Sequence, residues 1–263
     1  MVTAEAAATH CGSGLLTATR LRQAAGCGRG HPNGSFRRQV TVDIARLQSR
    51  YCIAMDLPDT TDHHHEAARF LAALDDDWAT LVATVGPCLH APKPAREPWQ
   101  ALLRAVAYQQ LSVRAGDTMI ARFLALYGAP DFPTPEQVCA TSPEALRGCG
   151  FSGRKANTIR GIAEAARSGV VPTLAQARDM DDEALITRLT ALHGIGRWTV
   201  EMMLIYTLGR TDLLPADDLG VREGYRRLRR LDRPPTPRQM TALALPWSPH
   251  RTAASWYLWR VPR

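Results

Sequence analysis

Two short segments toward the C-terminal end carry residue types from which chemistry can be built. LHGIGRWTVEM (192–202) places two glycines just before a helical pattern, and LLPADDLGVR (213–222) places two aspartates before another. The first amides of a helix have no partner within it and lie at the positive end of its dipole, so such a turn can bind phosphate. Paired aspartates are typical helix caps, but a carboxylate about 20 residues after a phosphate-binding turn can also face the sugar of a bound nucleotide.

The HGIG turn lies between the helical patterns DDEALITRLTAL and RWTVEMMLIYTL. We expect Gly194 and Gly196 to adopt positive φ and to let another backbone approach, with the second helix beginning at or near Gly196. Glycine is also common in ordinary turns between antiparallel helices, so the G-x-G spacing does not distinguish the two interpretations. In the L-x-G-I-G context the pattern is that of a helix-hairpin-helix element, which holds a DNA phosphate without reading sequence.

Helical periodicity continues almost throughout the chain from about residue 62. EAARFLAALDDDWATLVATV and EPWQALLRAVAYQQLSVRAGDTMIARFLALYG place apolar residues three and four positions apart. Ser142-Pro143 has the residue types of a helix start and Gly169 those of a helix end. No alternating strand pattern of useful length follows residue 60. The pattern predicts an all-helical domain over residues 61–263, with about nine or ten helices.

Residues 1–54 have a different composition, with seven arginines, two acidic residues, the segment GCGRGHPNGS and no sustained periodicity. We interpret residues 1–60 as a poorly ordered N-terminal extension. A start codon assigned too early, with the true start near Met55, is an equal alternative, and an import sequence is a weaker one. Because this segment carries most of the net charge of +7, the charge of the domain is weak evidence for nucleic-acid binding. The arginines at 222–233 are either a DNA-facing surface or a solvated helix face.

Several classes of protein and site are disfavoured. The chain contains no run of about 18 apolar residues, so we expect no membrane span. The six cysteines contain no C-x-x-C pair, which argues against zinc and iron–sulfur sites and is typical of reduced cytosolic cysteines. Consecutive helix residues point about 100° apart, so His63, His64 and His65 are predicted to form a solvated helix start and not a metal site.

Together, the two segments resemble the signature of the helix-hairpin-helix-GPD base-excision DNA glycosylases, specifically the DNA-3-methyladenine glycosylase II branch. Three further segments agree, namely AVAYQQLSVRAG, SPEALRGCGFSGRKANTIRGIA and PHRTAASWYLWR. The resemblance covers roughly residues 65–263. It implies an all-α fold of two lobes with little or no β structure and an active-site cleft between the lobes.

The resemblance also implies roles for individual residues. Asp218 would be the catalytic carboxylate, with Asp217 as the neighbouring cap, and Gln110 the wedge that fills the space left by an extruded nucleotide. The base pocket would be formed by Tyr108, Gln109, Trp198 and Trp259. The hairpin residues that bind DNA phosphate would be His193, Gly194, Gly196, Arg197 and Thr199. A sodium or potassium ion on the main-chain carbonyls of Thr190, Leu192 and Gly194 would be the one non-protein group, without an iron–sulfur cluster.

Bifunctional members, which also cut the strand, have lysine at the position of Trp198, because an amine must form a Schiff base with the sugar. The chain has only two lysines, Lys93 and Lys155, and neither lies in the hairpin. The resemblance therefore implies a monofunctional enzyme that removes alkylated purines such as 3-methyladenine and 7-methylguanine and leaves an abasic site. We expect a monomer acting on damaged double-stranded DNA in the bacterial cytoplasm, associated with the nucleoid and not with a membrane. A non-catalytic DNA-binding module, or a glycosylase for other damaged bases, remains the alternative.

Overall fold

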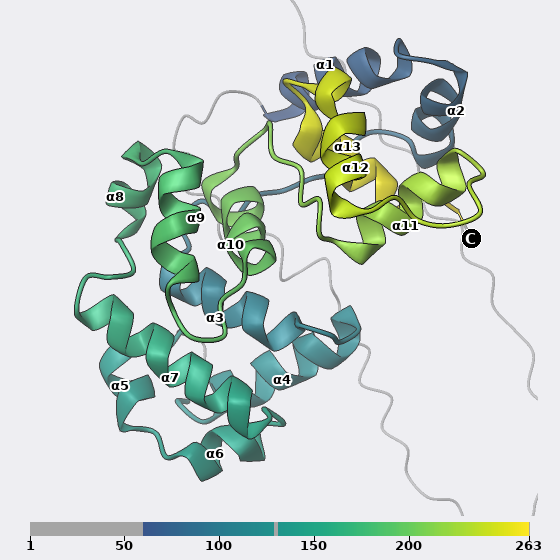
Figure 1. Ribbon diagram of the computed structural model, residues 1–263. Coiled ribbons are helices and arrows are strands. Elements are labelled where there is room, and N and C mark those ends of the chain that lie inside the picture. The colour runs from purple at the N-terminus through teal and green to yellow at the C-terminus, as the bar shows by residue number, and fades with distance from the viewer. Residues whose placement is uncertain (1–59, 129–130, 263) are drawn as a thin grey trace, which may run out of the picture. The chain divides into compact units, whose positions relative to one another are not determined.

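Helices make up the regular structure of residues 60–128 and 131–262, which are the residues described in the computed structural model (Figure 1). No strand occurs among these residues, which confirms the predicted all-α fold. Within the same ranges, no helix has the length and apolar character needed to cross a bilayer. The predicted N-terminal extension and the alternative start at Met55 lie outside the described residues.

The helices, in chain order, are α1 (Thr60–Ala72), α2 (Asp76–Val85), α3 (Pro98–Tyr108), α4 (Val113–Ala125), α5 (Pro135–Ala140), α6 (Pro143–Gly148), α7 (Gly153–Arg167), α8 (Leu174–Asp179), α9 (Asp182–Thr190), α10 (Arg197–Met203), the π-helical turn η2 (Leu204–Leu208), α11 (Leu219–Leu228), α12 (Pro237–Leu243), the 3₁₀ turn η3 (Leu245–Trp247) and α13 (Arg251–Leu258).

The predicted number of helices was too low, because thirteen α-helices are described. Two stretches with continuous periodicity are each divided by a side chain that caps a new helix. Asp75 accepts a hydrogen bond from the Trp78 amide and begins α2, and Ser112 accepts one from the Ala115 amide and begins α4. The second division leaves Gln109 and Gln110 in a loop between α3 and α4. The predicted cap at Ser142-Pro143 is confirmed at the start of α6.

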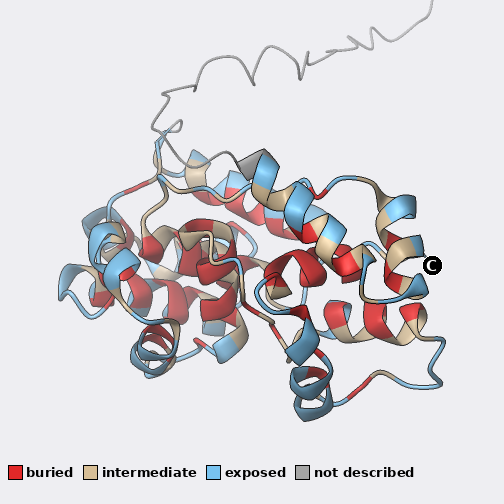
Figure 2. Cartoon of the chain, turned by 90° about the horizontal axis from the view of Figure 1, so that it is seen from above, coloured by how far each residue is buried: buried red, intermediate tan, exposed pale blue. Residues whose placement is uncertain are grey.

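Two separate groups of buried apolar side chains form the core of the described residues (Figure 2). The larger group joins α3 and α4 to α5 through α10, and the smaller one joins α1 and α2 to α11, α12 and α13. These are the two lobes that Figure 1 shows. Trp259, directly after α13, packs against both groups.

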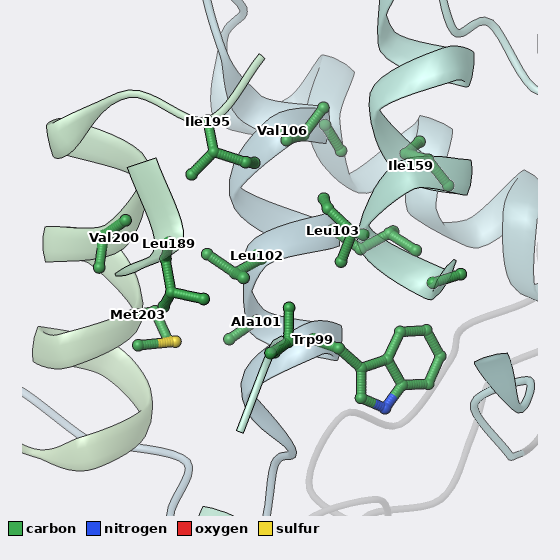
Figure 3. Packing of buried hydrophobic residues seen from close by; sticks show 14 of the residues in the cluster. Trp99, Ala101, Leu102, Leu103, Val106, Ile159, Leu189, Ile195, Val200 and Met203 are labelled. Atoms are coloured by element: carbon green, nitrogen blue, oxygen red, sulfur yellow. The ribbon is translucent and has the colours of Figure 1, made fainter. Parts of the chain in front are cut away.

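Helix α3 is the centre of the larger lobe. Its side chains are buried on almost every side, as expected for a helix that is apolar all round. Figure 3 shows Leu102 and Leu103 of α3 between Met203 of α10 and Ile159 of α7. Because α3 and α10 both pack in this core, the loop after α3 and the turn before α10 are held on the same rigid support.

The arginines of α11 and Arg229, the residue that follows it, are largely engaged within the protein. Arg226 and Arg227 bind Glu223, while Arg229 binds Asp75 and Asp77 at the start of α2. The structure therefore favours a structural role for this part of the arginine run over a DNA-facing surface.

Candidate active site

Asp218 is the N-cap of α11 and is held by three N–H donors. Its Oδ1 accepts hydrogen bonds from the Val221 amide and the Trp259 indole, both at 2.8 Å. Its Oδ2 accepts one from the Trp198 indole at 2.7 Å. The prediction that Asp217 is the helix cap was wrong, because Asp218 itself caps α11. The Asp218 carboxylate thus caps the start of α11, and two tryptophan indoles fix its orientation.

Two glycines on α11 allow Trp259 to reach Asp218. A Cβ on Gly224 would collide with the Leu258 carbonyl oxygen, and one on Gly220 would lie 2.9 Å from Trp259 Cδ1. The two glycines are one helical turn apart and therefore share a face. Along that face the end of α13 can approach α11 closely enough for the indole to donate to the carboxylate.

A cleft of about 870 Å³ opens beside Asp218, between helices of the two lobes. Its lining includes five aromatic side chains, Tyr108, Trp198, Tyr206, Trp256 and Trp259. The rings of Tyr206 and Trp259 lie nearly parallel, at 21°, with centroids 6.3 Å apart. Flat aromatic walls next to a fixed carboxylate suit a planar ligand whose attached group carries developing positive charge.

The π-helical turn η2 brings Tyr206 and Thr207 to this cleft, in line with the frequent placement of π turns at functional sites. Nearby, Nε2 of buried His90 lies 3.3 Å from the Ile205 carbonyl oxygen. Burial, together with the neighbouring His64, lowers the pKa of His90 to about 4. His90 is therefore neutral at physiological pH.

The loop after α3 is tied to the hairpin and to α7. The Gln109 side-chain amide donates to Thr199 Oγ1 at 3.0 Å and to the Gly194 carbonyl at 3.4 Å. From α7, Lys155 Nζ donates to the carbonyls of Ala107 and Gln109, at 3.1 and 2.8 Å. Gln110 is exposed and has a φ of 57°, in the left-handed region. The loop thus presents Gln110 from a braced backbone.

The hairpin between α9 and α10 contains one glycine with a positive φ and one with a negative φ. Gly194 has a φ of 81°, and a Cβ there would collide with Thr158 of α7. Gly196 has a φ of −94°, so the prediction of positive φ at this glycine was wrong. It caps α10 without a side chain, as the predicted helix start requires. The amides of Gly196, Arg197 and Trp198 donate no hydrogen bond within the described part of the chain.

Two of the hairpin side chains are already engaged. The Arg197 guanidinium binds Glu183 and Glu201, with its Nε 2.8 Å from Glu201 Oε1. Burial raises the pKa of Glu201 to about 7 against the opposing effect of Arg197. Thr199 is buried and accepts the Gln109 hydrogen bond. At this turn the groups free to meet an anion are therefore main-chain amides, with His193 exposed beside them.

Comparison with known proteins agrees with this geometry. Residues 103–249 match the model of the HhH-GPD superfamily base excision DNA repair proteins. The chain belongs to this superfamily. It is similar to DNA-3-methyladenine glycosylase 1 of Schizosaccharomyces pombe, with 44% identity over 196 residues that cover 73% of this chain and 85% of the relative. It is also similar to the alkylbase DNA glycosidase-like protein mag2 of the same organism, with 37% identity over 76% of this chain and 94% of the relative.

Among solved structures, this HhH-GPD protein is similar to the Schizosaccharomyces pombe 3-methyladenine DNA glycosylase Mag1 in complex with abasic DNA. The TM-score is 0.70 at 44% identity, covering 74% of this chain and 95% of that chain. The family resemblance inferred from the sequence motifs is confirmed.

The HhH-GPD fold brings most of the predicted site residues together. Tyr108, Trp198, Trp259 and Asp218 line the aromatic cleft. Gln109 does not line it, because its side chain turns toward the hairpin; the predicted pocket position was wrong for this residue. It lines a second groove of about 770 Å³, which meets the cleft at Trp198 and Asp218 and also includes Gln110 and Gly194.

Sequence reasoning missed several residues at the cleft, including Tyr206, Trp256 and His90. Trp256 could have been found, because it lies three residues before Trp259 and so on the same helix face. Tyr206 gave no signal, since its direction depends on the π turn. His90 also gave none, because its segment is irregular.

Proposed function

We propose that this HhH-GPD protein is a monofunctional DNA glycosylase of base excision repair, which removes alkylated purines such as 3-methyladenine and 7-methylguanine. The observation that carries the proposal is the Asp218 carboxylate, aimed by the Trp198 and Trp259 indoles at the mouth of an aromatic cleft. A protein that only bound DNA would need neither a positioned carboxylate nor such a cleft. The names of the similar proteins support the same activity.

The target base is inaccessible within a duplex, so the nucleotide must rotate out of the stack at a cost of a few kcal/mol. In this proposal the free amides at the start of α10 hold a backbone phosphate. Gln110, on its braced loop, fills the vacated space. The extruded base then enters the cleft beside Asp218, where a positively charged methylated purine is attracted to aromatic faces by roughly 0.5–2 kcal/mol.

The chemical step is hydrolysis of the N-glycosidic bond. As the bond from C1′ to the base nitrogen breaks, its electron pair leaves with the base, and a positively charged alkylated purine departs as a neutral molecule. The sugar becomes oxocarbenium-like, and the Asp218 carboxylate stabilises that positive charge. A water adds to C1′ and loses a proton, for which Asp218 is the nearest base. The products are the free base and an intact abasic site.

Strand cleavage is not part of the proposed reaction, because it needs an amine that attacks C1′. The Trp198 indole is engaged with Asp218, and Lys155 Nζ is engaged with two carbonyls of the loop after α3. Lys93 does line the cleft, so the point requires a direct test. Borohydride treatment during turnover should trap no covalent adduct; a trapped adduct that disappears in Lys93→Arg would show a lyase.

The decisive experiment measures base release from a methylated duplex under single-turnover conditions. Asp218→Asn should reduce release by about 10²–10³-fold, because the charge that stabilises the transition state is lost. Its binding to duplex DNA with a tetrahydrofuran abasic analogue should persist. Asp217→Asn is the matched control and should release base at close to the rate of the unmodified protein. Equal release by both variants would instead indicate that Asp218 has no chemical role, and no release by any protein would indicate a DNA-binding module.

We further propose that the protein works as a monomer on damaged double-stranded DNA in the cytoplasm, associated with the nucleoid. The chemistry needs no redox cofactor or iron–sulfur cluster. We also propose that a sodium or potassium ion binds the hairpin carbonyls of Thr190, Leu192 and Gly194. The Leu192 carbonyl accepts the Ile195 amide and the Gly194 carbonyl accepts Gln109, but each oxygen keeps a second lone pair for a cation. Such an ion would supply positive charge for phosphate binding.

A further inference from the structure

The lining of the aromatic cleft has a net positive charge. Its charged lining consists of Lys93, Arg96, Arg104, Arg260 and one carboxylate, Asp218. None of the four basic side chains forms an ion pair within residues 60–128 and 131–262. By contrast, Arg197 of α10 and Arg226 of α11 are paired with carboxylates. Four basic side chains without an ion pair therefore line the cleft into which a nucleotide would enter.

Among these basic groups, the pKa values of Arg96 and Arg104 are lowered by burial. Both side chains are half-buried, and Arg104 lowers the pKa of Arg96 further. Arg104 Nε is enclosed and has no acceptor among the described residues. Its guanidinium lies 5.3 Å from the Phe132 ring centroid. The Asp117 carboxylate partly offsets the effect of burial on the Arg104 pKa, but it already accepts the Tyr108 hydrogen bond. No ion pair joins Arg96 or Arg104 to a carboxylate of the described residues, so the burial of these two neighbouring cations is only partly compensated in the free protein. An anion bound to both guanidinium groups relieves that cost.

The position of the two arginines indicates which anion. Arg104 is one turn before Tyr108 on α3, and Tyr108 is followed at once by the loop that presents Gln110. Tyr108 donates to Asp117 at 2.5 Å, and its pKa is raised to about 12 by burial and that carboxylate, so it adds no negative charge. The free amides of the hairpin lie beyond the same loop, which Gln109 ties to Thr199. An extruded nucleotide has a phosphate on each side, and the hairpin can hold only one.

We propose that Arg96 and Arg104 form a second phosphate-binding site, for the backbone phosphate on the other side of the extruded nucleotide. This inference rests on the proposed function, since it takes an extruded nucleotide as the ligand. Guanidinium groups suit the task because they bind phosphate oxygens in a planar, two-point geometry. With one phosphate at the amides of α10 and the other at the arginines, the strand is held on both sides of Asp218.

The test measures the salt dependence of binding to a duplex that carries a tetrahydrofuran abasic analogue, which needs no catalysis. Each lost phosphate contact should reduce the slope of log K against log salt by about 0.9. Arg96→Gln and Arg104→Gln should each reduce the slope, and the double variant should reduce it little further, because both arginines bind one phosphate. Arg238→Gln, at an exposed position of α12 outside the cleft, is the matched control and should leave the slope nearly unchanged.

A second arm identifies the phosphate. Single phosphates next to the analogue are replaced one at a time by neutral methylphosphonates. Replacement at two of these positions should weaken DNA binding by the unmodified protein. Arg96→Gln and Arg104→Gln should be insensitive to one of these replacements and normally sensitive to the other. Arg96→Lys and Arg104→Lys retain the charge and should keep most of the slope, which separates charge from a folding defect.

An unchanged slope in the glutamine variants, or full sensitivity at both phosphates, would overturn the inference. If, in addition, the glutamine variants released 7-methylguanine faster relative to an uncharged lesion, the arginines would face the base and not a phosphate. Failure of the proposed function has a different signature. Wild-type protein would release no base, while the slopes and phosphonate pattern would still report the second phosphate site.

Discussion

The two helices that begin at the cleft satisfy their first turns in opposite ways. Helix α11 starts with Asp218, whose carboxylate accepts the Val221 amide and two indole N–H groups. Helix α10 starts with Gly196, which has no side chain to offer, and the next two amides find no acceptor in the part of the chain that the structure describes. The start of α11 is capped by a negative charge of the protein itself, whereas the free amides at the start of α10 can bind an anion from outside.

This contrast shows how one local feature serves two tasks. A helix N-terminus favours an anion, and the identity of the capping residue decides whether that anion belongs to the protein or to the ligand. At α11 the anion is the catalytic carboxylate of the proposed reaction. At α10 the nearby acids, Glu183 and Glu201, are bound by Arg197 and do not occupy the amides.

The start of α10 depends on Gly194, so Gly194→Ala should have the largest effect on stability. The new Cβ meets Thr158 and the backbone keeps a φ of 81°. Left-handed strain and overpacking together should cost about 2–4 kcal/mol, which lowers the melting temperature by roughly 5–10 °C. Thermal unfolding followed by circular dichroism measures this change.

The double variant Gly194→Ala/Thr158→Ala separates the two causes. Removing Thr158 Oγ1 relieves the collision but not the backbone strain, so the double variant should recover part of the loss relative to the sum of the single changes. Simple additivity of the two substitutions would show that Thr158 does not require glycine at this position.

The start of α11 is tested by Trp198→Phe, which retains an aromatic ring but removes the donor to Asp218 Oδ2. Hydrogen bonds to charged groups contribute about 1.5–3 kcal/mol, so single-turnover base release should fall by roughly tenfold or more. Trp256→Phe removes an indole from the same cleft without touching the hydrogen bonds of Asp218. An equal loss in the control would mean that ring size, and not the aim of the carboxylate, matters.

Gly196→Asp would make the start of α10 resemble that of α11. Its backbone is extended and nothing lies within 4 Å of a new Cβ, so an aspartate fits. The carboxylate should cap the free amides and leave thermal stability equal or slightly higher. It should also repel phosphate and weaken binding to abasic-analogue DNA by about 1 kcal/mol, roughly fivefold. Gly196→Asn is the uncharged control, and a loss of affinity equal to that of the aspartate variant would point to sterics and not to charge.

The smallest expected effect is a pH dependence at His90, whose Nε2 lies against the Ile205 carbonyl of η2. Because the folded-state pKa of His90 is about 4 and lies below the usual 6.5, the unfolded chain takes up a proton first as pH falls. The free energy of unfolding should therefore decrease between about pH 6.5 and about pH 4. At about pH 6 the decrease should be about 1 kcal/mol. His90→Gln should show a shallower loss in denaturant titrations at these pH values. Identical pH profiles would indicate that His90 is not protected from protonation.

Much of the local structure could be predicted from short-range patterns. The predicted caps at Ser142-Pro143 and the helix start after Gly196 are confirmed, because capping and helix periodicity are properties of neighbouring residues. The two helix breaks that were missed lie just before α2 and α4. Their capping residues, Asp75 and Ser112, stand within sequence that has continuous apolar periodicity. There the local signal was present but weaker than the pattern around it.

The chemistry of individual side chains was harder to predict, because it depends on partners far away in the chain. Gln109 was expected in the base pocket, but Thr199, 90 positions later, takes its hydrogen bond. Arg197 was expected at a phosphate, but its guanidinium binds Glu183. Neither partner can be recognised from the sequence around the residue itself.

By itself, the sequence determined that this protein is helical, where the hairpin turns, and that an aspartate begins the helix after it, because propensity, capping and turn chemistry act over a few residues. Only the tertiary structure decided that Trp198 of α10 and Trp259, directly after α13, position that aspartate, and that Arg96 and Arg104 form no ion pair with the described residues. Such relations depend on the close approach of distant helices, which close packing around α3 and against the Gly220–Gly224 face of α11 produces.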